Sequence, residues 1–580
     1  MKLDIVKGEY DTFYYMAKTI RQGGKIKTVR VEKLGKHSEL VKDYENPVEY
    51  LRTYVLKKTA EETKGIFSVS VTHQLSKQLT HHSKVSNSNL LNIGYFYLNA
   101  IYKQLNLNDF FKAVTRDTKI KYNPNDILKY LTFARILAPK SKLSTYDDFE
   151  SYYGAPKMHI ENIYRTLDLI HEHLDAYQTH LYKNSLNISN RNTKVLYYDC
   201  TNYFFEIETE DDFRKYGQSK DHKPNPIVQM GLFMDGDGVP LAFNVNPGNT
   251  NEQTTVLPLE RQIIKDFKLS NFIYIADAGL NSNDIRLFNC MLDRDYIVTQ
   301  SLKKLPKETQ DLVLTDEHWL KLNASDKEKQ RFYDISEIKD DDKDTYFKVM
   351  TIDNPIDIGL RETHENGRLK KKTTFKQQLI VTYNKKYELH QKEIRANQII
   401  RADKLIKNNS ISKTSQTSPK RFAKNIGDKP VYDLDIDKIV EENRYDGYYA
   451  LVTSLENDSI SDIIRVSQRR WEIEESFRIL KTNFKSRPVY HQKDRRIISH
   501  FSICFTSLLV YRLLENKLGN KYTIHEIITQ LKNMSVLPMN EAIFEASYAG
   551  SDLLNDLSKT FDIYLDKTCY LNTLLNKYKN

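Results

Sequence analysis

Cysteine is scarce in this sequence, and the few cysteines lie far apart. Only four occur among 580 residues, at Cys200, Cys290, Cys504 and Cys569. They form no Cys-x-x-Cys motif and no zinc-type Cys/His pattern, and their wide spacing gives no disulfide framework. The scarcity therefore argues against a zinc protein and against a secreted, disulfide-stapled protein, and it favours a reducing compartment.

Targeting and membrane signals are also missing from the sequence. The chain begins MKLDIVKGEY, which lacks the basic and apolar stretch of a signal peptide. We find no run of about 18 apolar residues of the kind that spans a bilayer, and no internal repeat. We therefore expect a cytoplasmic protein with no membrane partner.

Positive charge is in modest excess and is concentrated in one stretch. Lys and Arg number 87 against 77 Asp and Glu, in a chain whose hydrophobic content of 40% is enough for globular cores. Residues 465–496 hold ten of these cations and only four acids. Such a local excess suits a polyanionic partner such as DNA.

Periodicity in the middle of the chain predicts a ribonuclease H-like sheet. Three strand-like runs come first, Val195–Phe205, Pro226–Asp235 and Val239–Gly248, the last two joined by a tight turn. A helix, the short run NFIYIADAG, a second helix and the strand YIVTQSL follow. This order of elements is that of a ribonuclease H-like core, so the predicted fold class is α/β with a mixed sheet.

A polar, β-rich stretch interrupts this pattern before the strand YDGYYALVTS resumes it, and we interpret the stretch as an inserted domain. The chain is predicted to begin with a β-hairpin, and both flanks of the core show helical periodicity. Six regions are predicted: a β-rich N-terminal region (1–85), a helical region that could bind DNA (86–190), the first part of the core (191–302), the insertion domain (303–444), the second part of the core (445–515) and C-terminal helices (516–580).

Two aspartates occupy positions where burial is costly. Asp199 lies inside the apolar run VLYYDCTN, and Asp277 lies near the end of FIYIADAG. A carboxylate in such a strand must be paired or bind a cation. The structural alternatives are a hydrogen bond to Asp199 from the nearby Thr201 or Asn202, and capping of the next helix by Asp277.

A third carboxylate lies on a single predicted helix at about residues 466–481. Helical spacing gathers a Ser, a Glu and three cations on one face: Ser467, Arg470, Glu474, Arg478 and Lys481. The other face is predicted to be the buried one: Val466, Trp471, Ile473, Phe477 and Leu480. Taken alone, this could be an exposed helix with ordinary ion pairs. If both aspartates project toward it, three carboxylates converge as a pair of Mg²⁺ or Mn²⁺ ions requires.

The stretches YYDCTN, YIADAG and WEIEESFRILK together resemble the catalytic core of bacterial insertion-sequence transposases of the DDE type, in the group with a β-rich domain before the final Glu. The last helix of that group carries a Tyr-Arg-Glu-Lys signature, with two, three and six residues between successive members. Arg470, Glu474 and Lys481 match this spacing, and Ser467 stands at the Tyr position. The resemblance extends from about Val195 to Leu513, and the earlier turn ILAPKSK also resembles the group.

The resemblance implies a function and a set of ligands. Asp199, Asp277 and Glu474 would bind two Mg²⁺ (or Mn²⁺) ions and catalyse the cutting of transposon ends and the joining of the 3′-OH to target DNA. The implied partners are double-stranded DNA, as terminal inverted repeats and target, and a second copy of the chain, because two ends must be held together. The protein would then be DNA-associated in a bacterial cytoplasm.

Candidate DNA contacts lie on the Glu474 helix and just after it. They are all cations: Arg470, Arg478, Lys481, Arg487, Lys493, Arg495 and Arg496. In the segment KSRPVYH, Tyr490 and His491 could stack on an exposed base. His500 could equally be a histidine of the hydrophobic core.

Two other functions stay open from the sequence. A ribonuclease H-like nuclease would hydrolyse nucleic acid without joining it, and a non-catalytic descendant of a transposase would only bind DNA. An intact set of three carboxylates argues against the second, because a DNA-binding protein gains nothing from unpaired carboxylates. Arg470, Lys481 and the inserted stretch favour transposition over simple hydrolysis.

Overall fold

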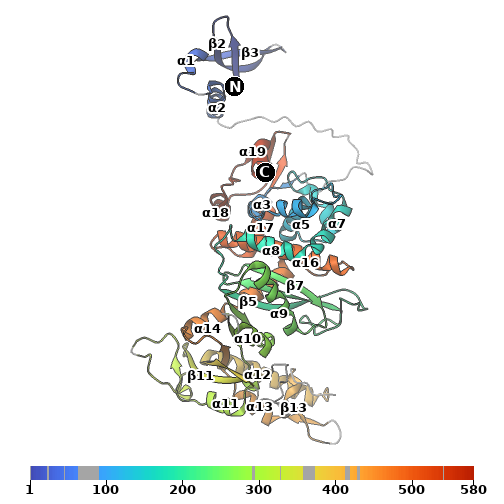
Figure 1. Ribbon diagram of the computed structural model, residues 1–580, viewed down its shortest axis with the longest axis vertical. Coiled ribbons are helices and arrows are strands. Elements are labelled where there is room, and N and C mark those ends of the chain that lie inside the picture. The colour runs from blue at the N-terminus through green and yellow to red at the C-terminus, as the bar shows by residue number, and fades with distance from the viewer. Residues whose placement is uncertain are drawn as a thin grey trace, which may run out of the picture. The chain divides into compact units, whose positions relative to one another are not determined.

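The chain forms two compact units, Met1–Asn87 and Ser88–Asn580, each with its own hydrophobic core (Figure 1). The computed structural model describes these residues: 2–22, 25–44, 46–62, 90–290, 294–326, 328–356, 373–411, 418–427, 431–539 and 541–580.

The N-terminal unit is a three-stranded antiparallel sheet with two helices. β2 (Thr12–Gln22) lies between β1 (Lys2–Lys7) and β3 (Lys25–Lys36). α1 (His37–Leu40) and α2 (Pro47–Glu62) follow. Among the residues whose burial is described, its buried hydrophobic residues are Tyr14, Met16, Ala17, Leu51 and Val55. The hairpin predicted for this region is the pair β2–β3.

A nine-stranded sheet forms the centre of the larger unit, and five of its strands lie in the order β7-β6-β5-β8-β9. Their bounds are: β5 (Val195–Phe204), β6 (Ile227–Asp235), β7 (Pro240–Pro247), β8 (Ile273–Ala276) and β9 (Asp295–Thr299). β5, β6 and β7 are antiparallel, whereas β8 runs parallel to β5 and β9 parallel to β8. This arrangement confirms the predicted ribonuclease H-like α/β class.

The stretch interpreted as an insertion adds strands to this same sheet. β15 (Tyr448–Thr453) pairs antiparallel with β9. β12 (Thr373–Asn384), β11 (Thr345–Ile356) and β10 (Leu320–Lys321) then continue the sheet outward. The two longest strands of the insertion therefore extend the core sheet, while a long helix, α12 (Lys385–Lys407), follows β12.

Side chains of β5 alternate between two hydrophobic cores. Tyr198 and Cys200 belong to the core that includes residues of α9 (Glu252–Gln262). Tyr197 and Tyr203 belong to the larger core that includes α16 (Asp494–Lys517). Because side chains alternate along a strand, position 199 lies on the α16 side of the sheet.

α16 is the central helix of the larger core. It packs against α3 (Tyr95–Gln104), α5 (Pro124–Leu137) and α7 (Ile160–Glu172), and against β7. By length and composition it is also a helix that could cross a membrane, although 94% of its most apolar stretch is buried inside the fold. This corrects the expectation that the chain holds no segment of that kind, because a helix buried on all sides is as apolar as a membrane span.

The C-terminal region contains strands that the sequence did not predict. β16 (Ser535–Pro538), β17 (Ile543–Ala546) and β18 (Cys569–Leu571) form a four-stranded sheet with β4 (Leu91–Asn92). Each has only two to four residues, which is too short for alternation to be recognised.

The remaining α-helices and strands are α4 (Leu107–Thr115), α6 (Lys142–Asp147), α8 (Leu174–Ser185), α10 (Asn283–Cys290), α11 (Lys307–Val313), β13 (Ala423–Asn425), β14 (Tyr432–Leu434), α13 (Ile436–Asn443), α14 (Ile460–Gln468), α15 (Trp471–Arg478), α17 (Ile524–Asn533), α18 (Asp552–Phe561) and α19 (Asn572–Lys579). Short 3₁₀ or π turns complete the structure: η1 (Phe149–Ser151), η2 (Ile263–Phe267), η3 (Ala278–Leu280), η4 (Leu302–Lys304), η5 (Ile335–Glu337), η6 (Pro419–Phe422) and η7 (Ile479–Asn483).

Candidate active site

The register of two parallel strands brings Asp199 and Asp277 to the same level. In the pairing of β5 with β8, Tyr197 is the partner of Ile275. Two residues further along each chain stand Asp199 and Asp277. Because neighbouring strands lie about 4.8 Å apart, the two carboxylates are close neighbours at the carboxyl end of β8.

Asp199 is a largely buried carboxylate held in place by its own backbone. Its Oδ1 accepts a hydrogen bond of 2.8 Å from the backbone N–H of Cys200. Burial raises the pKa of Asp199 to about 6, Lys220 and Arg470 act to lower it, and Asp277 raises it further. The alternative partner Asn202 is engaged elsewhere, since its side chain donates to the carbonyl of Gln218 and accepts from the N–H of Lys220.

Asp277 combines a capping role with an ion pair. Its Oδ1 accepts a hydrogen bond of 2.6 Å from the N–H of Ala278 at the start of the short turn η3, so the capping alternative does occur. The same oxygen lies 2.8 Å from a guanidinium nitrogen of Arg470. Half of its side chain remains exposed, so the cap does not remove it from the site.

Arg470 connects the aspartates to the helix that carries Glu474. Its guanidinium contacts Asp277 and lies 3.6 Å from Glu474 Oε1. It also lowers the pKa of Asp199, so one cation acts on all three predicted carboxylates. Arg470 therefore lies between Asp277 and Glu474, and its charge also acts on Asp199.

The three carboxylates are suitable ligands for a hard divalent cation, but their present positions do not surround a single metal site. Within the described ranges, no three or more His, Cys, Asp and Glu side chains are close enough together to hold a metal ion as they stand. The guanidinium of Arg470 takes that central place between Asp277 and Glu474. Carboxylate oxygens are nevertheless the ligands that Mg²⁺ and Mn²⁺ prefer, and two in-register aspartates repel each other until a cation lies between them.

The helix that carries Glu474 is broken, which corrects the prediction of a single helix. α14 ends at Gln468 and α15 begins at Trp471, and the N–H of Arg470 bonds to the carbonyl three residues earlier, Ser467. The helix then continues through the π turn η7. No Pro or Gly marks the break between Ser467 and Arg478, so the sequence offered no signal for it.

One residue of the predicted buried stripe is exposed at the break. Ile473, Phe477 and Leu480 are buried as predicted, but Trp471 is 57% exposed. Trp471 is the first residue of α15, and it lines a surface pocket with Arg469 and other polar residues. Its assignment to the buried stripe was therefore wrong.

Lys481 lies deeper than a surface lysine and faces Asp221. Its Nζ lies 3.7 Å from Asp221 Oδ2 and 5.4 Å from the centre of the Tyr203 ring on β5. Burial lowers the pKa of Lys481, and Asp221 acts to raise it. Arg487 forms an ion pair with the same carboxylate. Two predicted DNA contacts thus share one acidic partner in the loop between β5 and β6.

Sequence reasoning missed two charged residues of this site, Lys220 and Asp221. Lys220 is the cation that lowers the pKa of Asp199 most, and its Nζ lies 3.5 Å from Glu252 Oε1 at the start of α9. Its neighbour Asp221 holds Lys481 and Arg487. The run SKDHKP that contains both has the composition of an ordinary polar loop, so only the fold shows that it returns to β5.

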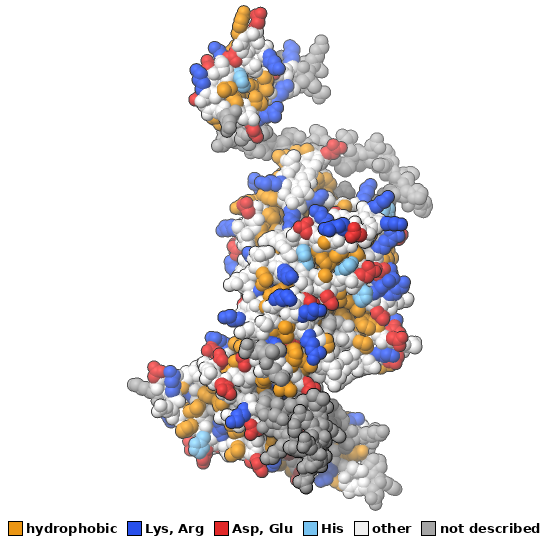
Figure 2. All heavy atoms as spheres, in the orientation of Figure 1, with side chains coloured by type: hydrophobic (Ala, Val, Ile, Leu, Met, Phe, Trp, Pro, Cys, Tyr) orange, Lys and Arg blue, Asp and Glu red, His pale blue; other side chains and the backbone are white. Residues whose placement is uncertain are grey.

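The other predicted cations have different partners. Arg478 lies 3.0 Å from Glu475. Arg495 and Arg496 both pair with Asp168 on α7, at 3.1 and 3.2 Å. Lys493 is exposed just before α16. In Figure 2, basic and acidic side chains are interspersed over the visible face of the larger unit.

The aromatic and histidine candidates after the helix behave differently from one another. Tyr490 is 68% exposed, so its ring is available for stacking. His491 instead packs edge-on against Tyr164 and near His500. His500 is buried, which agrees with a core position.

Comparison with known proteins identifies the family. Residues 200–510 match the family described as "Transposase DDE domain". No curated protein matches the sequence. One solved structure, a cryo-EM structure of a piggyBac transposase synaptic complex with hairpin DNA, shows 9% identity over 84% of both chains, and its TM-score of 0.34 is too low to inform any detail of the site. Because the matched family domain covers more than half of the 580 residues, the chain belongs to the DDE transposase family and is a DNA transposase.

Proposed function

We propose that this transposase cuts the ends of its own mobile element and joins the freed 3′-OH to target DNA, using two divalent ions held by Asp199, Asp277 and Glu474. The observation that carries the proposal is that Asp199 on β5 and Asp277 just after β8 come at the same level of two parallel strands, with Arg470 linking Asp277 to Glu474. All three are oxygen donors, as Mg²⁺ and Mn²⁺ require.

Each residue has a role that follows from its chemistry. When bound, the divalent ions would lower the pKa of a water nucleophile and stabilise the leaving 3′ oxygen. Asp199, whose pKa is about 6, is ionised at neutral pH and ready to bind a cation. Arg470, once released from Asp277 and Glu474, offers a bidentate pair of N–H donors to a phosphate.

Lys481 and Arg487 would hold the DNA backbone beside the cut. Both contact Asp221 in the DNA-free chain, so a phosphate would compete with that carboxylate for them. Such contacts make affinity fall as salt rises. Arg478, Lys493, Arg495 and Arg496 remain predicted DNA contacts of the outer surface.

The test is cleavage of a labelled duplex that carries the element's own end, with Mg²⁺ or Mn²⁺. We expect Glu474→Gln to lose at least a hundredfold in nicking, because the variant replaces an anionic ligand with a neutral amide. Glu475→Gln is the matched control: this next glutamate on α15 pairs with Arg478 and Arg512 and should be dispensable for nicking. Both variants should bind the end in Ca²⁺.

The outcomes separate this proposal from its two rivals. A 3′-OH product that is joined to target DNA supports transposition, and nicking without joining indicates a ribonuclease H-like nuclease. Binding without nicking by the wild-type chain indicates a non-catalytic descendant. An equal loss of nicking activity in Glu474→Gln and Glu475→Gln would contradict the assignment of Glu474 as a metal ligand.

Two further parts of the proposal concern partners and place. We infer a homodimer in the DNA complex, because two element ends must be held together for joining. The four cysteines are all free, which supports a reducing, cytoplasmic setting in which the protein is associated with DNA. Sedimentation with and without end DNA tests the dimer.

A further inference from the structure

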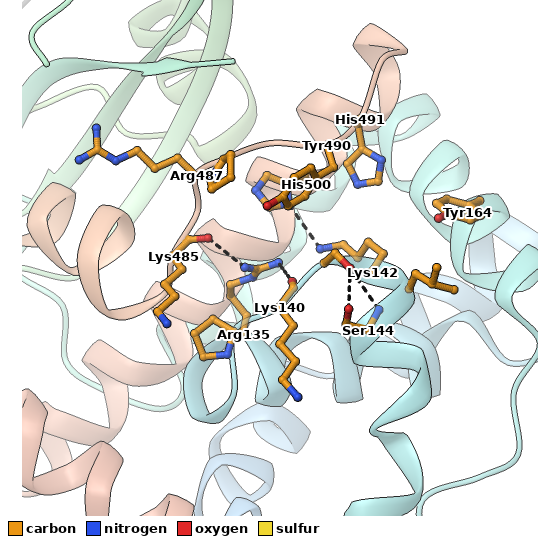
Figure 3. A pocket seen from close by; sticks show the side chains of 14 residues that line it. Arg135, Lys140, Lys142, Ser144, Tyr164, Lys485, Arg487, Tyr490, His491 and His500 are labelled. Atoms are coloured by element: carbon orange, nitrogen blue, oxygen red, sulfur yellow. Dashed lines mark hydrogen bonds between the residues drawn. The ribbon is translucent and has the colours of Figure 1, made fainter. Parts of the chain in front are cut away.

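A pocket lined by basic side chains lies beside the proposed active site, and no acidic residue lines it. It is a pocket of about 580 Å³, within the range of roughly 300–1,000 Å³ typical of ligand pockets. Its wall is formed by the turn between α5 and α6, by Tyr164 of α7, by the segment after η7 and by His500 of α16 (Figure 3). None of the fourteen lining residues is Asp or Glu.

Three basic side chains of this pocket are almost fully buried. Arg135, Lys142 and His500 are each 5% exposed. Arg135 donates to the carbonyls of Phe484 and Lys485 at 3.1 and 3.2 Å, which fixes its guanidinium at the pocket wall. Buried cations are normally paired with carboxylates, so two buried cations, Arg135 and Lys142, without an acid in the wall are unusual.

Lys142 is held by histidine rather than by an acid. Its Nζ lies 3.4 Å from His500 Nδ1, and His500 Nε2 lies 3.0 Å from the carbonyl oxygen of Ser486. Because a carbonyl only accepts, Nε2 carries the proton and Nδ1 accepts from Lys142. Burial holds the pKa of Lys142 well below its usual range, and Arg135 lowers it further. An anion in the pocket would oppose both effects and raise the pKa of Lys142.

Three acids near the pocket are already paired with other cations. Asp148 lies 2.5 Å from Lys140 at the pocket's rim, and Asp168 pairs with Arg495 and Arg496. Asp221 pairs with Arg487, which also lines the pocket. Arg135 already donates to backbone carbonyls, so Lys142, whose described partner is the neutral imidazole of His500, is the cation left for a ligand.

We propose that this pocket binds a backbone phosphate of the element's DNA together with its sugar, with Lys142 as the buried anchor. Arg487 lines the pocket and shares Asp221 with Lys481, so a chain of charged contacts runs from η7 of the proposed active site to the pocket. The exposed ring of Tyr490 stands at the same wall, where it can stack on the attached base. The inference rests on the proposed function, because its ligand is the DNA that the active site cuts.

The test compares Lys142→Met with Lys112→Met. Methionine keeps the length of the buried stem and removes the charge, whereas Lys112 is an exposed lysine of α4 with 71% of its side chain accessible. In Ca²⁺, we expect Lys142→Met to bind end DNA roughly tenfold more weakly and to flatten the slope of log K against log salt by about 0.9. Lys112→Met should match the wild type, and thermal melting of both variants checks folding.

A second measurement uses the unaltered protein. Duplexes with one neutral methylphosphonate at successive positions should show one position that weakens wild-type binding, and Lys142→Met should be insensitive at that position, because the two changes remove the same contact. Equal sensitivity of the variant at every position would overturn the proposal. So would an affinity and salt slope for Lys142→Met equal to those of Lys112→Met.

A titration with inorganic phosphate tests whether the pocket binds a free anion or a phosphate of the DNA backbone. If phosphate raises the melting temperature of the wild type but not of Lys142→Met, while both bind end DNA equally, the pocket takes a free anion and the DNA proposal fails. If the methylphosphonate coupling is found but the wild type never nicks DNA with Mn²⁺, the pocket stands and the proposed function fails.

Discussion

Arg470 stands between carboxylates that would otherwise repel one another. It pairs with Asp277 at 2.8 Å, reaches Glu474 at 3.6 Å and lowers the pKa of Asp199. A guanidinium cannot lose its proton at any ordinary pH, so it is a constant positive charge at the point where divalent ions would bind. If these carboxylates bind divalent ions as proposed, metal and arginine would compete for them in the absence of DNA.

This competition makes an unusual prediction for Arg470→Gln. Removing the guanidinium should make Mn²⁺ bind the DNA-free protein several-fold more tightly, because no cation has to be displaced. The same variant should bind end DNA roughly tenfold more weakly, because a charge-assisted contact to phosphate is lost. Calorimetric titration with Mn²⁺ and a DNA-binding assay in Ca²⁺ measure the two effects. Arg469→Gln is the control, since its partner is Glu472. Weaker Mn²⁺ binding by Arg470→Gln would refute the competition.

Some residues of this candidate site could be predicted from the sequence, and others could not. Asp199 and Asp277 could be found because a carboxylate inside an apolar run has few explanations, and the spacing of Arg470 to Glu474 pointed to the third. Lys220 and Asp221 could not be found, because a charged loop has the same composition whether it is solvated or folded back onto a strand. Their roles depend on contacts between distant parts of the chain.

Among the elements, periodicity succeeded for strands and failed where the backbone departs from a regular helix. The five core strands, including the four-residue β8, lie in apolar runs of the sequence, whereas the break before α15 and the π turn η7 have no local sequence signal. The strands β11 and β12 were predicted as β-rich, but whether they extend the core sheet depends on the pairing of β12 with β15. Such pairing is a long-range property.

The exposure of Trp471 and the burial of Phe477 predict different effects for substitutions at these two aromatic residues of α15. Phe477→Ala should cost about 3–5 kcal/mol of stability, because the ring is only 5% exposed. Trp471→Ala should cost no more than about 0.5 kcal/mol, as at other exposed positions. Urea denaturation measures both. Acrylamide quenching gives an independent check, because the sequence has only two tryptophans and the other, Trp319, is fully buried. An equal loss of stability in the two variants would show that Trp471 is buried, as the sequence had predicted.

At the scale of the whole molecule, the core of the larger unit joins segments from its two ends. Tyr97 of α3 donates a hydrogen bond of 2.9 Å to the carbonyl of Ile563, and Leu565, Tyr570 and Leu575 belong to the same hydrophobic core as α16. The C-terminal region is therefore part of the fold that supports the sheet. The N-terminal unit has a separate core of its own.

This difference predicts opposite outcomes for two truncations. A chain of residues 88–580 should keep the main unfolding transition within about 2 °C of the full chain, because none of the larger unit's core residues is lost. A chain that stops at residue 533 loses α18, α19 and the strands β16, β17 and β18, and should unfold cooperatively at a much lower temperature or fail to fold. Differential scanning calorimetry of both chains is the measurement. The chain of residues 88–580 should also retain Glu474-dependent nicking, since residues 1–87 supply none of the three carboxylates. A large drop in its melting temperature would show that the two units depend on each other for stability.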